Sequence, residues 1–245
     1  MRHASFAHAF QPIVDVVEQT VFAHEALIRG SDGAGALSVL SGLDKPALHA
    51  LDRESCLIAI ASAARLEMQG HLSINALPDS VDGAAHATAI HQTCLTTGFP
   101  ISKIILEVTE NEAIADVERF IEAVSSYRRL SVQIAIDDFG AGHSGLNLLA
   151  DFQPDLLKLD MNLVRNIESR GPRQAIVRAI LQVCEDLGIE VIAEGIESES
   201  EFAWFVDHNV RLFQGYLFAR AGFDSLPPVR FPEQSTARRT EFFAR

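Results

Sequence analysis

Short β-rich runs alternate with longer stretches of helical periodicity along most of the chain, and this alternation constrains the fold most strongly. The candidate strands are residues 10–14, 21–28, 72–75, 104–108, 132–136, 156–159, 191–193 and 212–214. The candidate helices are residues 46–68, 84–97, 112–129, 145–151, 173–187 and 199–208. This alternation indicates a parallel α/β fold. A length of 245 residues also lies close to the roughly 250 residues that are typical of a (β/α)₈ barrel.

The first two candidate strands depart from the alternation. The first is followed by Asp15, and only residues 16–20 lie between Asp15 and the second strand. Such a link is too short for a crossover helix, so we expect an antiparallel hairpin near the start of the chain. We expect a single domain over residues 1–245. Residues 226–245 contain three prolines and several arginines, and we expect them to form a C-terminal surface tail.

The composition is that of a soluble globular protein, with 48% hydrophobic and 22% charged residues. The 33 acidic and 20 basic residues give a net charge of −13, so we expect no DNA binding and no attraction to an anionic membrane. Cys56, Cys94 and Cys184 are far apart and odd in number, which argues against a disulfide framework or a CxxC zinc site and fits a reducing cytoplasm. No run reaches the roughly 18 apolar residues of a membrane helix.

Asp137 and Asp138 stand side by side where an apolar run ends and a glycine-rich segment begins. Taken alone, such a pair is more often a solvated strand end or an Asx turn than a binding site. The other candidate strands change that interpretation, because most of them end in a residue able to bind metal or phosphate: Asn75, Glu107, Lys158, Asp160, Glu194 and Gln214. In a parallel barrel these ends meet at one rim, where we expect Gln11 and Glu25 of the hairpin to join them.

Hard oxygen ligands dominate this predicted rim: Glu25, Asn75, Glu107, Asp137, Asp138 and Glu194. Such a set suits Mg²⁺ or Mn²⁺ and not zinc, and its carboxylates would repel one another without cations. Lys158 has two interpretations. It forms a structural pair with Asp160 or Glu194, or it orients and helps to deprotonate a metal-bound water.

The segment after the two aspartates contains Gly140-x-Gly142-x-x-Gly145, and Asp160 follows 20 residues after Gly140. This spacing matches the dinucleotide-binding fingerprint. Against that interpretation, the adjacent aspartates would face the pyrophosphate, and strands with polar ends already precede the segment. The glycines fit better as a mobile loop that passes close to a metal and a substrate.

The same polar residues resemble the motifs of the EAL-domain family of bacterial cyclic di-GMP phosphodiesterases over nearly the whole chain. The matching segments are Phe10-Gln11-Pro12-Ile13-Val14, Glu25-Ala26-Leu27 with Arg29, Ile74-Asn75, Glu107-Val108-Thr109-Glu110, Asp137-Asp138-Phe139-Gly140, Lys158-Leu159-Asp160, Ala193-Glu194-Gly195-Ile196-Glu197 and Gln214-Gly215-Tyr216. The resemblance implies an α/β fold, a modified (β/α)₈ TIM-like barrel whose first strand is antiparallel. This agrees with the hairpin expected above.

The resemblance also implies a reaction, in which two Mg²⁺ or Mn²⁺ ions hold a phosphodiester of cyclic di-GMP and a water attacks in line to give linear pGpG. One ion would be held by Glu25, Asn75, Glu107 and Asp137, and the second by Asp137, Asp138 and Glu194. Lys158 would position or deprotonate the water. The substrate and water site would be lined by Gln11, Leu27, Arg29, Asp160, Glu197 and Gln214.

Three implied roles have competing interpretations. Glu110 would steady the loop after the aspartate pair, as a third catalytic residue beside Lys158 and Glu194, but it also lies inside the capping box Thr109-x-x-Glu112. Glu197 stands next to a candidate helix cap, and Arg29 could be an ordinary surface arginine. His143 stands where the family usually has tyrosine, which could alter closure of the loop.

The resemblance implies a homodimer, and any sensor domain or sensor protein would lie outside this chain. An alternative function is that of a non-hydrolysing cyclic di-GMP receptor or interaction domain. Degenerate members of the family have usually lost acidic ligands, and this chain retains them. The resemblance therefore favours an active hydrolase.

Overall fold

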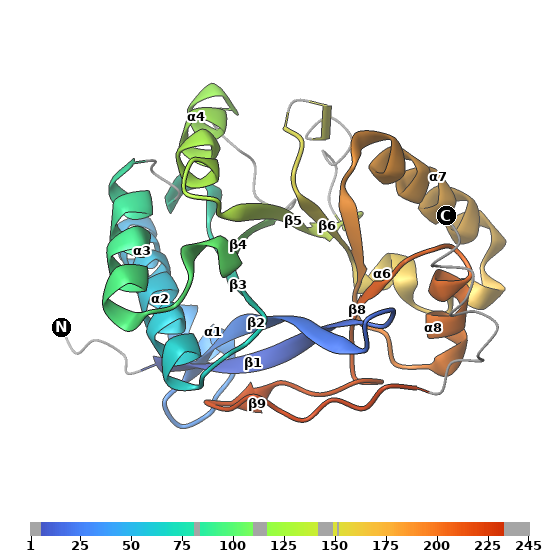
Figure 1. The fold of residues 1–245 in the computed structure, drawn as a ribbon, viewed down its shortest axis with the longest axis horizontal. Helices are drawn as coiled ribbons and strands as arrows, with labels where there is room; N and C mark the ends of the chain where they lie inside the picture. Colours follow the sequence, from blue (N-terminus) through green and yellow to red (C-terminus); the bar gives the residue numbers. More distant parts are fainter. Residues whose placement is uncertain (1–5, 81–83, 110–116, 142–148, 151, 233–245) are drawn as a thin grey trace.

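The computed structural model describes residues 6–80, 84–109, 117–141, 149–150 and 152–232, and these form a closed barrel with surrounding helices (Figure 1). The barrel strands are β1 (Phe6–Asp15), β2 (Thr20–Gly30), β3 (His71–Asn75), β4 (Ile104–Thr109), β5 (Gln133–Phe139), β6 (Leu156–Leu159), β7 (Glu190–Ala193) and β8 (Leu212–Gln214). Every strand predicted from the sequence is therefore present. A short strand, β9 (Gly222–Phe223), pairs with β1 and has no counterpart in the sequence prediction.

Strand β1 runs antiparallel to both of its barrel neighbours, β2 and β8. Neighbouring strands from β2 to β8 are parallel. The hairpin places Gln11 opposite Glu25, and the pairing of Ile13 with Gln214 closes the barrel. The α/β class, the barrel and the antiparallel first strand are confirmed.

Helices cover the outside of the barrel, with α2, α3 and α4 along one side and α7 and α8 along the other (Figure 1). Their bounds are α1 (Ala36–Leu40), α2 (Lys45–Arg65), α3 (Ala84–Thr97), α4 (Val117–Arg128), α6 (Met161–Val164), α7 (Gly171–Leu187) and α8 (Glu199–Val206). The sequence pattern does not predict the short helices α1 and α6, and the helix predicted over 145–151 falls largely outside the described residues. Among the described helices, none has the length and apolarity needed to cross a membrane.

Local capping explains where two of the long helices begin. The Asp44 side chain accepts a hydrogen bond from the backbone N–H of Ala47 at 2.9 Å, just before α2. At α8, Ser198 and Glu201 form both halves of a capping box. The box expected at Thr109 reaches into residues 110–116, outside the described part of the chain.

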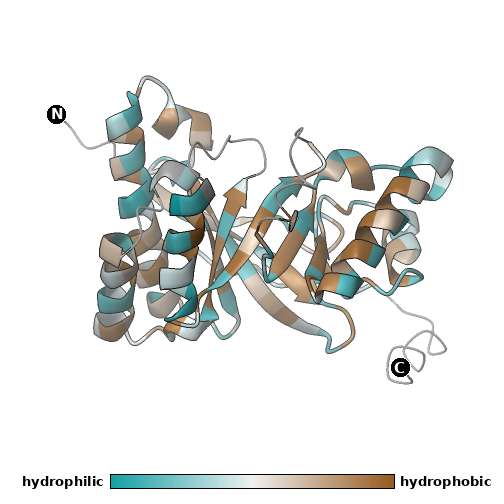
Figure 2. Ribbon diagram, turned by 90° about the horizontal axis from the view of Figure 1, so that it is seen from above, coloured by the Kyte–Doolittle hydropathy of each residue, from teal (hydrophilic) through white to brown (hydrophobic). Residues whose placement is uncertain are grey.

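The barrel interior contains a compact set of buried apolar side chains, one from almost every strand: Ile13, Ala23, Ile105, Ala135, Leu156, Ile192 and Leu212. We call this set the apolar layer. A larger apolar core lies between the sheet and the helices. Figure 2 shows hydrophobic colouring on the central strands and mixed colouring on the helices, as expected for helices with one face packed and one face in water.

The described part of the expected C-terminal tail, residues 226–232, packs against the rest of the molecule. Leu226, Val229 and Phe231 are partly buried against the large core, and the backbone N–H of Arg230 donates to the carbonyl oxygen of Phe218 at 3.1 Å. This part is a packed surface segment. Residues 233–245 lie outside the described part.

Candidate active site

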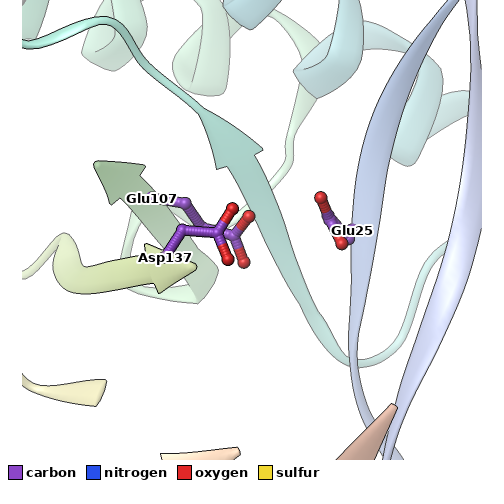
Figure 3. Close-up of side chains that lie close together, drawn as sticks. All are labelled: Glu25, Glu107 and Asp137. Atoms are coloured by element: carbon purple, nitrogen blue, oxygen red, sulfur yellow. The ribbon is translucent and has the colours of Figure 1, made fainter. Parts of the chain in front are cut away.

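Carboxylates from several strands meet at the carboxyl end of the barrel, and we call them the acidic rim: Glu25, Glu107, Asp137, Asp138 and Glu194. Oxygen atoms of Glu25, Glu107 and Asp137 lie within 4.8 Å of one another, and so do those of Asp137, Asp138 and Glu194. Figure 3 shows Glu107 and Asp137 side by side, with Glu25 facing them from β2. Asp137 belongs to both groups.

The backbone turns at the end of β5, which explains how two successive aspartates serve one site. Asp138 has a φ of 55°, in the left-handed region, and the pairing of β5 with β6 shifts register between Ile136 and Phe139. In a regular strand the two side chains would point to opposite faces. Aspartate tolerates a left-handed backbone better than most residues, so the turn causes less backbone strain at Asp138 than it would with most other side chains.

Lys158 of β6 lies in the middle of the acidic rim with only 1% of its surface exposed. Its Nζ is 2.8 Å from Glu194 Oε1, 2.9 Å from Glu107 Oε1, 2.9 Å from Asp137 Oδ1 and 3.5 Å from Glu25 Oε2. A buried ammonium without partners would be strongly unfavourable, and these four contacts compensate for the loss of water. Of the partners expected from the sequence, Glu194 contacts Lys158, while Asp160 is not among its ion-pair partners in the described chain.

Burial and mutual repulsion perturb the ionisation of the rim. Burial opposes the charged form of Lys158, but the surrounding carboxylates outweigh it and hold the pKa of Lys158 well above its usual value. Burial raises the pKa of Glu107 to about 8, with Glu25 and Asp137 adding to the rise and Lys158 opposing it. Burial also raises the pKa of Glu194 well above its usual value. The rim thus contains more carboxylates than one ammonium can hold ionised, and Glu107 and Glu194 bind protons more readily than exposed carboxylates do.

The pKa values of Glu25 and Asp138 shift in opposite directions. Burial would raise the pKa of Glu25, yet Lys158 and hydrogen bonds from Gln214 and Asn75 lower it. Burial raises the pKa of Asp138 to about 6, and the neighbouring charges of Asp137 and Asp160 add to this rise. Compared with Glu107, Asp138 and Glu194, Glu25 is therefore better held in its ionised form.

Hydrogen bonds orient two of the rim carboxylates. Glu25 accepts from Asn75 Nδ2 at 3.0 Å and from Gln214 Nε2 at 2.8 Å. Glu107 accepts from Ser73 Oγ at 2.6 Å. The sequence interpretation missed Ser73, although its position two residues before Asn75 on the same strand places both side chains on one face.

The residues of the rim fit a hard divalent cation. Carboxylate and amide oxygens are the ligands that Mg²⁺, Mn²⁺ and Ca²⁺ prefer. Glu107 Oε2 is buried and has no hydrogen-bond partner in the described part of the chain, so one oxygen in the centre of the rim is left for another ligand. The repulsion between the rim carboxylates, which contributes to their raised pKa values, would also be relieved by such an ion.

A cavity of about 280 Å³, which we call the rim cavity, opens beside the carboxylates. Four residues predicted to contact substrate lie in its wall: Gln11, Asp160, Glu197 and Gln214. Besides Gln214, which donates to Glu25, two of them have structural contacts. Asp160 accepts from the backbone N–H of Asn162 at 2.9 Å and caps α6, and Glu197 pairs with Arg165 at 2.9 Å.

Leu27 and Arg29, the other two predicted substrate residues, line a separate apolar cavity of about 260 Å³ that also touches Asn75. The guanidinium of Arg29 donates to the carbonyl oxygen of its neighbour Ile28 at 2.8 Å. Glu110, His143 and the glycine loop around it lie outside the described residues. The structure therefore brings the predicted ligands together but divides the predicted substrate residues between two cavities.

Residues 1–221 match the EAL domain family. The chain belongs to this family. The family resemblance inferred from the motifs is confirmed, and the EAL motif itself, Glu25-Ala26-Leu27, places its glutamate in the acidic rim.

Curated EAL relatives include longer proteins with different names. BluF of Escherichia coli (strain K12), a blue light- and temperature-regulated antirepressor, is 35% identical over 229 residues, which cover 92% of this chain and 57% of BluF. The cyclic di-GMP phosphodiesterase PdeR of the same organism is 37% identical over 144 residues, or 59% of this chain and 21% of PdeR. The chain thus spans little more than half of one relative and about a fifth of the other.

Solved EAL structures resemble the whole barrel. A standalone EAL protein from Vibrio cholerae O395 in its c-di-GMP-bound form is 42% identical, with a TM-score of 0.90 over 94% of this chain and 98% of that protein. Klebsiella pneumoniae BlrP1, in a manganese and cyclic di-GMP complex, is 37% identical, with a TM-score of 0.86 over 91% of this chain and 58% of BlrP1. Similar barrels therefore bind cyclic di-GMP, and one of them does so with a divalent metal.

Proposed function

We propose that this EAL domain hydrolyses one phosphodiester bond of cyclic di-GMP to give linear pGpG, with two Mg²⁺ or Mn²⁺ ions at the acidic rim. The observation that carries the proposal is the arrangement around Lys158, where carboxylates from separate strands converge beside a polar cavity. The cyclic di-GMP complexes of similar barrels support the substrate.

The ligand assignment follows from the two carboxylate groups of the rim. Glu25, Glu107 and Asp137, with the amide of Asn75 beside Glu25, would hold one ion. Asp137, Asp138 and Glu194 would hold the second, so that Asp137 serves both. When bound, the two ions would supply charge stabilisation for the attacking and leaving oxygens of an in-line displacement.

Lys158 would orient the attacking water through its ammonium group. Without cations, the surrounding carboxylates hold the pKa of Lys158 well above its usual value. Two bound cations would offset those carboxylates and make the neutral amine, the form that could deprotonate the water, easier to reach. The cavity residues Gln11 and Asp160 would contact the substrate beside this point. Glu110, which lies outside the described residues, keeps its proposed role in steadying the loop after the aspartate pair.

The test is a hydrolysis assay with Mg²⁺ or Mn²⁺ in which pGpG is separated by chromatography. Asp137→Asn and Glu25→Gln should remove turnover, because each change withdraws a ligand from the centre of the rim. Asp186→Asn on the exposed surface of α7 is the matched control and should keep wild-type turnover. If the wild type binds cyclic di-GMP with metal and yields no pGpG, the hydrolase proposal fails.

A second candidate function is that of a non-hydrolysing cyclic di-GMP receptor. The similarity to BluF, which is named as an antirepressor, supports this alternative. Tight binding in EDTA, without turnover when metal is added, would favour the receptor. Binding that requires metal and proceeds to pGpG would favour the enzyme.

We also propose a homodimer, and a sensor domain or protein outside these residues. The light and temperature regulation in the name of BluF supports the second part. Light scattering coupled to size-exclusion chromatography would test the first: a monomer mass at micromolar concentration, with and without ligand, would contradict it.

A further inference from the structure

Glu201, in the first turn of α8, is a buried carboxylate that lies outside the acidic rim. Only 2% of its surface is exposed. Within the described structure it belongs to neither carboxylate group of the rim and does not line the rim cavity. Burying a charge is unfavourable unless donors replace the water that it loses. The proposed chemistry gives this buried charge no role, so its partners need an explanation.

Two separate segments place backbone donors on this one carboxylate. Its Oε2 accepts from the backbone N–H of Glu197 at 3.0 Å and from that of Ser198 at 3.1 Å, in the loop that follows β7. Its Oε1 accepts from the backbone N–H of Asn166 at 3.0 Å, in the segment that follows β6 and α6. The carboxylate therefore joins the continuation of β6 to the continuation of β7. We call this arrangement the Glu201 bridge.

The capping box of α8 explains only part of this arrangement. A capping box needs one acceptor at the position of Glu201, directed at the backbone N–H of Ser198, and glutamate or glutamine can supply it. Asn166 is 35 residues away from Glu201 in the sequence, and its bond to the second oxygen does not help α8 to begin. The use of both carboxylate oxygens therefore needs a reason other than helix capping.

Arg165 adds a positive charge to the Glu201 bridge. Its Nη1 is 3.4 Å from Glu201 Oε1, and its Nη2 is 2.9 Å from Glu197 Oε1. The carbonyl oxygen of Arg165 accepts from Arg173 Nη1 at 3.1 Å, which ties the same segment to α7. Burial would raise the pKa of Glu201, but the three backbone donors and Arg165 outweigh it and lower this pKa. Both oxygens are thus available as acceptors.

The two segments that the bridge joins begin at residues of the active site. Lys158 lies on β6, and Glu194 directly follows β7. Their side chains meet, with 2.8 Å between Lys158 Nζ and Glu194 Oε1. The segments also touch directly, because a Cβ added at Gly195 would lie 2.6 Å from the Cβ of Met161. A shift of one segment against the other would therefore move Glu194 relative to the rest of the rim.

We propose that Glu201 is a positioning residue for the second metal ion of the rim, because its bridge fixes Glu194 beside Lys158. This inference rests on the two-ion site of the proposed function and adds a residue to it. Removal of a group that orients a metal ligand from outside typically weakens metal binding by about 10-fold to 100-fold. Glu201 acts through the backbone next to Glu194 and not through its carboxylate, so the expected effect is at the lower end.

The test is Mn²⁺ binding without nucleotide, followed by electron paramagnetic resonance. Two Mn²⁺ ions that share Asp137 should be spin-coupled, so the coupled spectrum reports that the second site is filled. Glu201→Gln keeps an acceptor for the N–H of Ser198 but turns an amide N–H₂ toward the N–H of Asn166. The variant should therefore keep the α8 cap and lose the bridge. It should raise the Kd of the second Mn²⁺ by about 10-fold and leave the Kd of the first unchanged.

Three further variants separate positioning from helix capping and from charge. Ser198→Ala removes the hydroxyl that accepts from the N–H of Glu201 at 3.2 Å, so it should lower the free energy of unfolding and leave both Mn²⁺ affinities unchanged. Glu199→Gln neutralises an exposed acid in the same turn and should leave both affinities unchanged. Arg165→Met keeps the carboxylate bridge and loses one ion pair, so it should raise the Kd of the second ion by about 2-fold to 5-fold.

Turnover gives an independent measurement, because a positioning defect in metal binding should be overcome by excess metal. In hydrolysis assays, Glu201→Gln should need about 10-fold more Mn²⁺ for half-maximal turnover and should approach the wild-type kcat at saturating Mn²⁺. A kcat that stays low at saturating Mn²⁺, with an unchanged Mn²⁺ requirement, would contradict the proposal.

The outcomes distinguish this inference from the proposed function. If folded Glu201→Gln binds the second Mn²⁺ as tightly as the wild type, the positioning role is refuted while the proposed function stands. If Glu201→Gln does not fold, an unchanged second ion in Arg165→Met refutes the role. If Ser198→Ala weakens the second ion as much as Glu201→Gln does, helix capping accounts for the effect and the role is refuted.

The wild type decides the remaining cases. If it binds two coupled Mn²⁺ ions and forms no pGpG, while Glu201→Gln loses the second ion, the positioning role stands and the hydrolase proposal fails. If the wild type binds only one Mn²⁺, both the two-ion site and the positioning role fail.

Discussion

The apolar layer and the acidic rim occupy the same barrel interior and come from the same strands, yet they have opposite character. In most strands the polar residue lies two positions after the apolar one: Ala23 and Glu25, Ile105 and Glu107, Ala135 and Asp137, Leu156 and Lys158, Ile192 and Glu194, Leu212 and Gln214. Two residues along a strand span about 6.6 Å. The barrel interior therefore changes from apolar to charged within a very short distance. We infer that the apolar layer mainly contributes stability and that the acidic rim mainly contributes the chemistry.

Strand β1 supports this division, because along this strand the polar residue comes before the apolar one. Its polar residue Gln11 comes two positions before Ile13, as its antiparallel direction requires for both to lie at their proper levels. If the division holds, a change in the rim should alter chemistry, and a change in the layer should alter stability. Lys158 is the expected exception, because the loss of its charge should lower both stability and turnover.

Lys158→Met should have the largest effect. Breaking a buried ion pair typically costs about 3–5 kcal/mol, and here one ammonium contacts four carboxylates, so metal-free stability should fall by at least this order. Turnover should also be lost. Urea unfolding in EDTA measures the first effect, and Mn²⁺ should restore part of the stability by neutralising the carboxylates. Lys103→Met, at an exposed contact, is the control; equal stability of the two variants would contradict the prediction.

Ile105→Ala in the apolar layer should lower stability without changing the chemistry. Truncation of a fully buried isoleucine typically costs about 2–5 kcal/mol. Activity per folded molecule should remain near that of the wild type, since Glu107 keeps its strand and partners. Thermal unfolding and an active-site-normalised assay measure the two quantities. Ile121→Ala on α4, at a partly exposed position, should change little. A large loss of turnover in folded Ile105→Ala would show that the levels are coupled.

Two histidines on the face of the β1–β2 hairpin away from the rim should make the protein less stable in acid. We call this loss of stability at low pH the acid limit. His8 and His24 are buried, and burial lowers the pKa of each from 6.5 to about 4. A histidine whose folded pKa is depressed favours folding when neutral, so stability is complete above about pH 6.5 and decreases as pH falls toward 4. At about 1.4 kcal/mol per pKa unit, each residue accounts for about 3 kcal/mol of that loss.

His24→Gln should flatten the decrease between pH 6.5 and pH 4, as measured by chemical unfolding at a series of pH values. His91→Gln, at a partly exposed position on α3, is the control and should leave the slope unchanged. An unchanged slope in His24→Gln would exclude this residue as a source of the acid limit.

Ser73→Ala should have the smallest effect and tests the boundary between the levels. Ser73 is buried and donates to Glu107 Oε1 at 2.6 Å. A side-chain hydrogen bond typically contributes about 0.5–1.5 kcal/mol, and the loss stays in this range because Lys158 still contacts the same oxygen of Glu107. The free energy of unfolding in EDTA and the affinity for Mn²⁺ should both decrease modestly. Ser126→Ala on the exposed face of α4 should affect neither.

The sequence predicts the strands and the rim well because both depend on local periodicity. An apolar run in a strand ends in a polar residue, and parallel strands place those ends at one edge. Asp137 illustrates the strength of this reasoning, since it is ambiguous as half of an acidic pair and becomes specific only through the ends of the other strands.

Three-dimensional contacts account for what the sequence does not predict. Nothing in the sequence around Lys158 shows that four carboxylates from distant strands contact it. Ser73 was hidden because a serine in an apolar strand has no distinctive pattern. Arg29 and Leu27 follow Glu25 closely in sequence, but the strand carries them to a different cavity. The short helices α1 and α6 contain too few turns to produce a periodic signal.

The pairing that closes the barrel also sets when a complete site can exist. Gln214 pairs with Ile13 across β8 and β1, and its side chain donates to Glu25 at 2.8 Å. A chain emerging from the ribosome would have Gln11 and Glu25 paired early, yet it could not finish their surroundings until residue 214 had been made. Metal binding by nascent or truncated chains should therefore appear abruptly near this length.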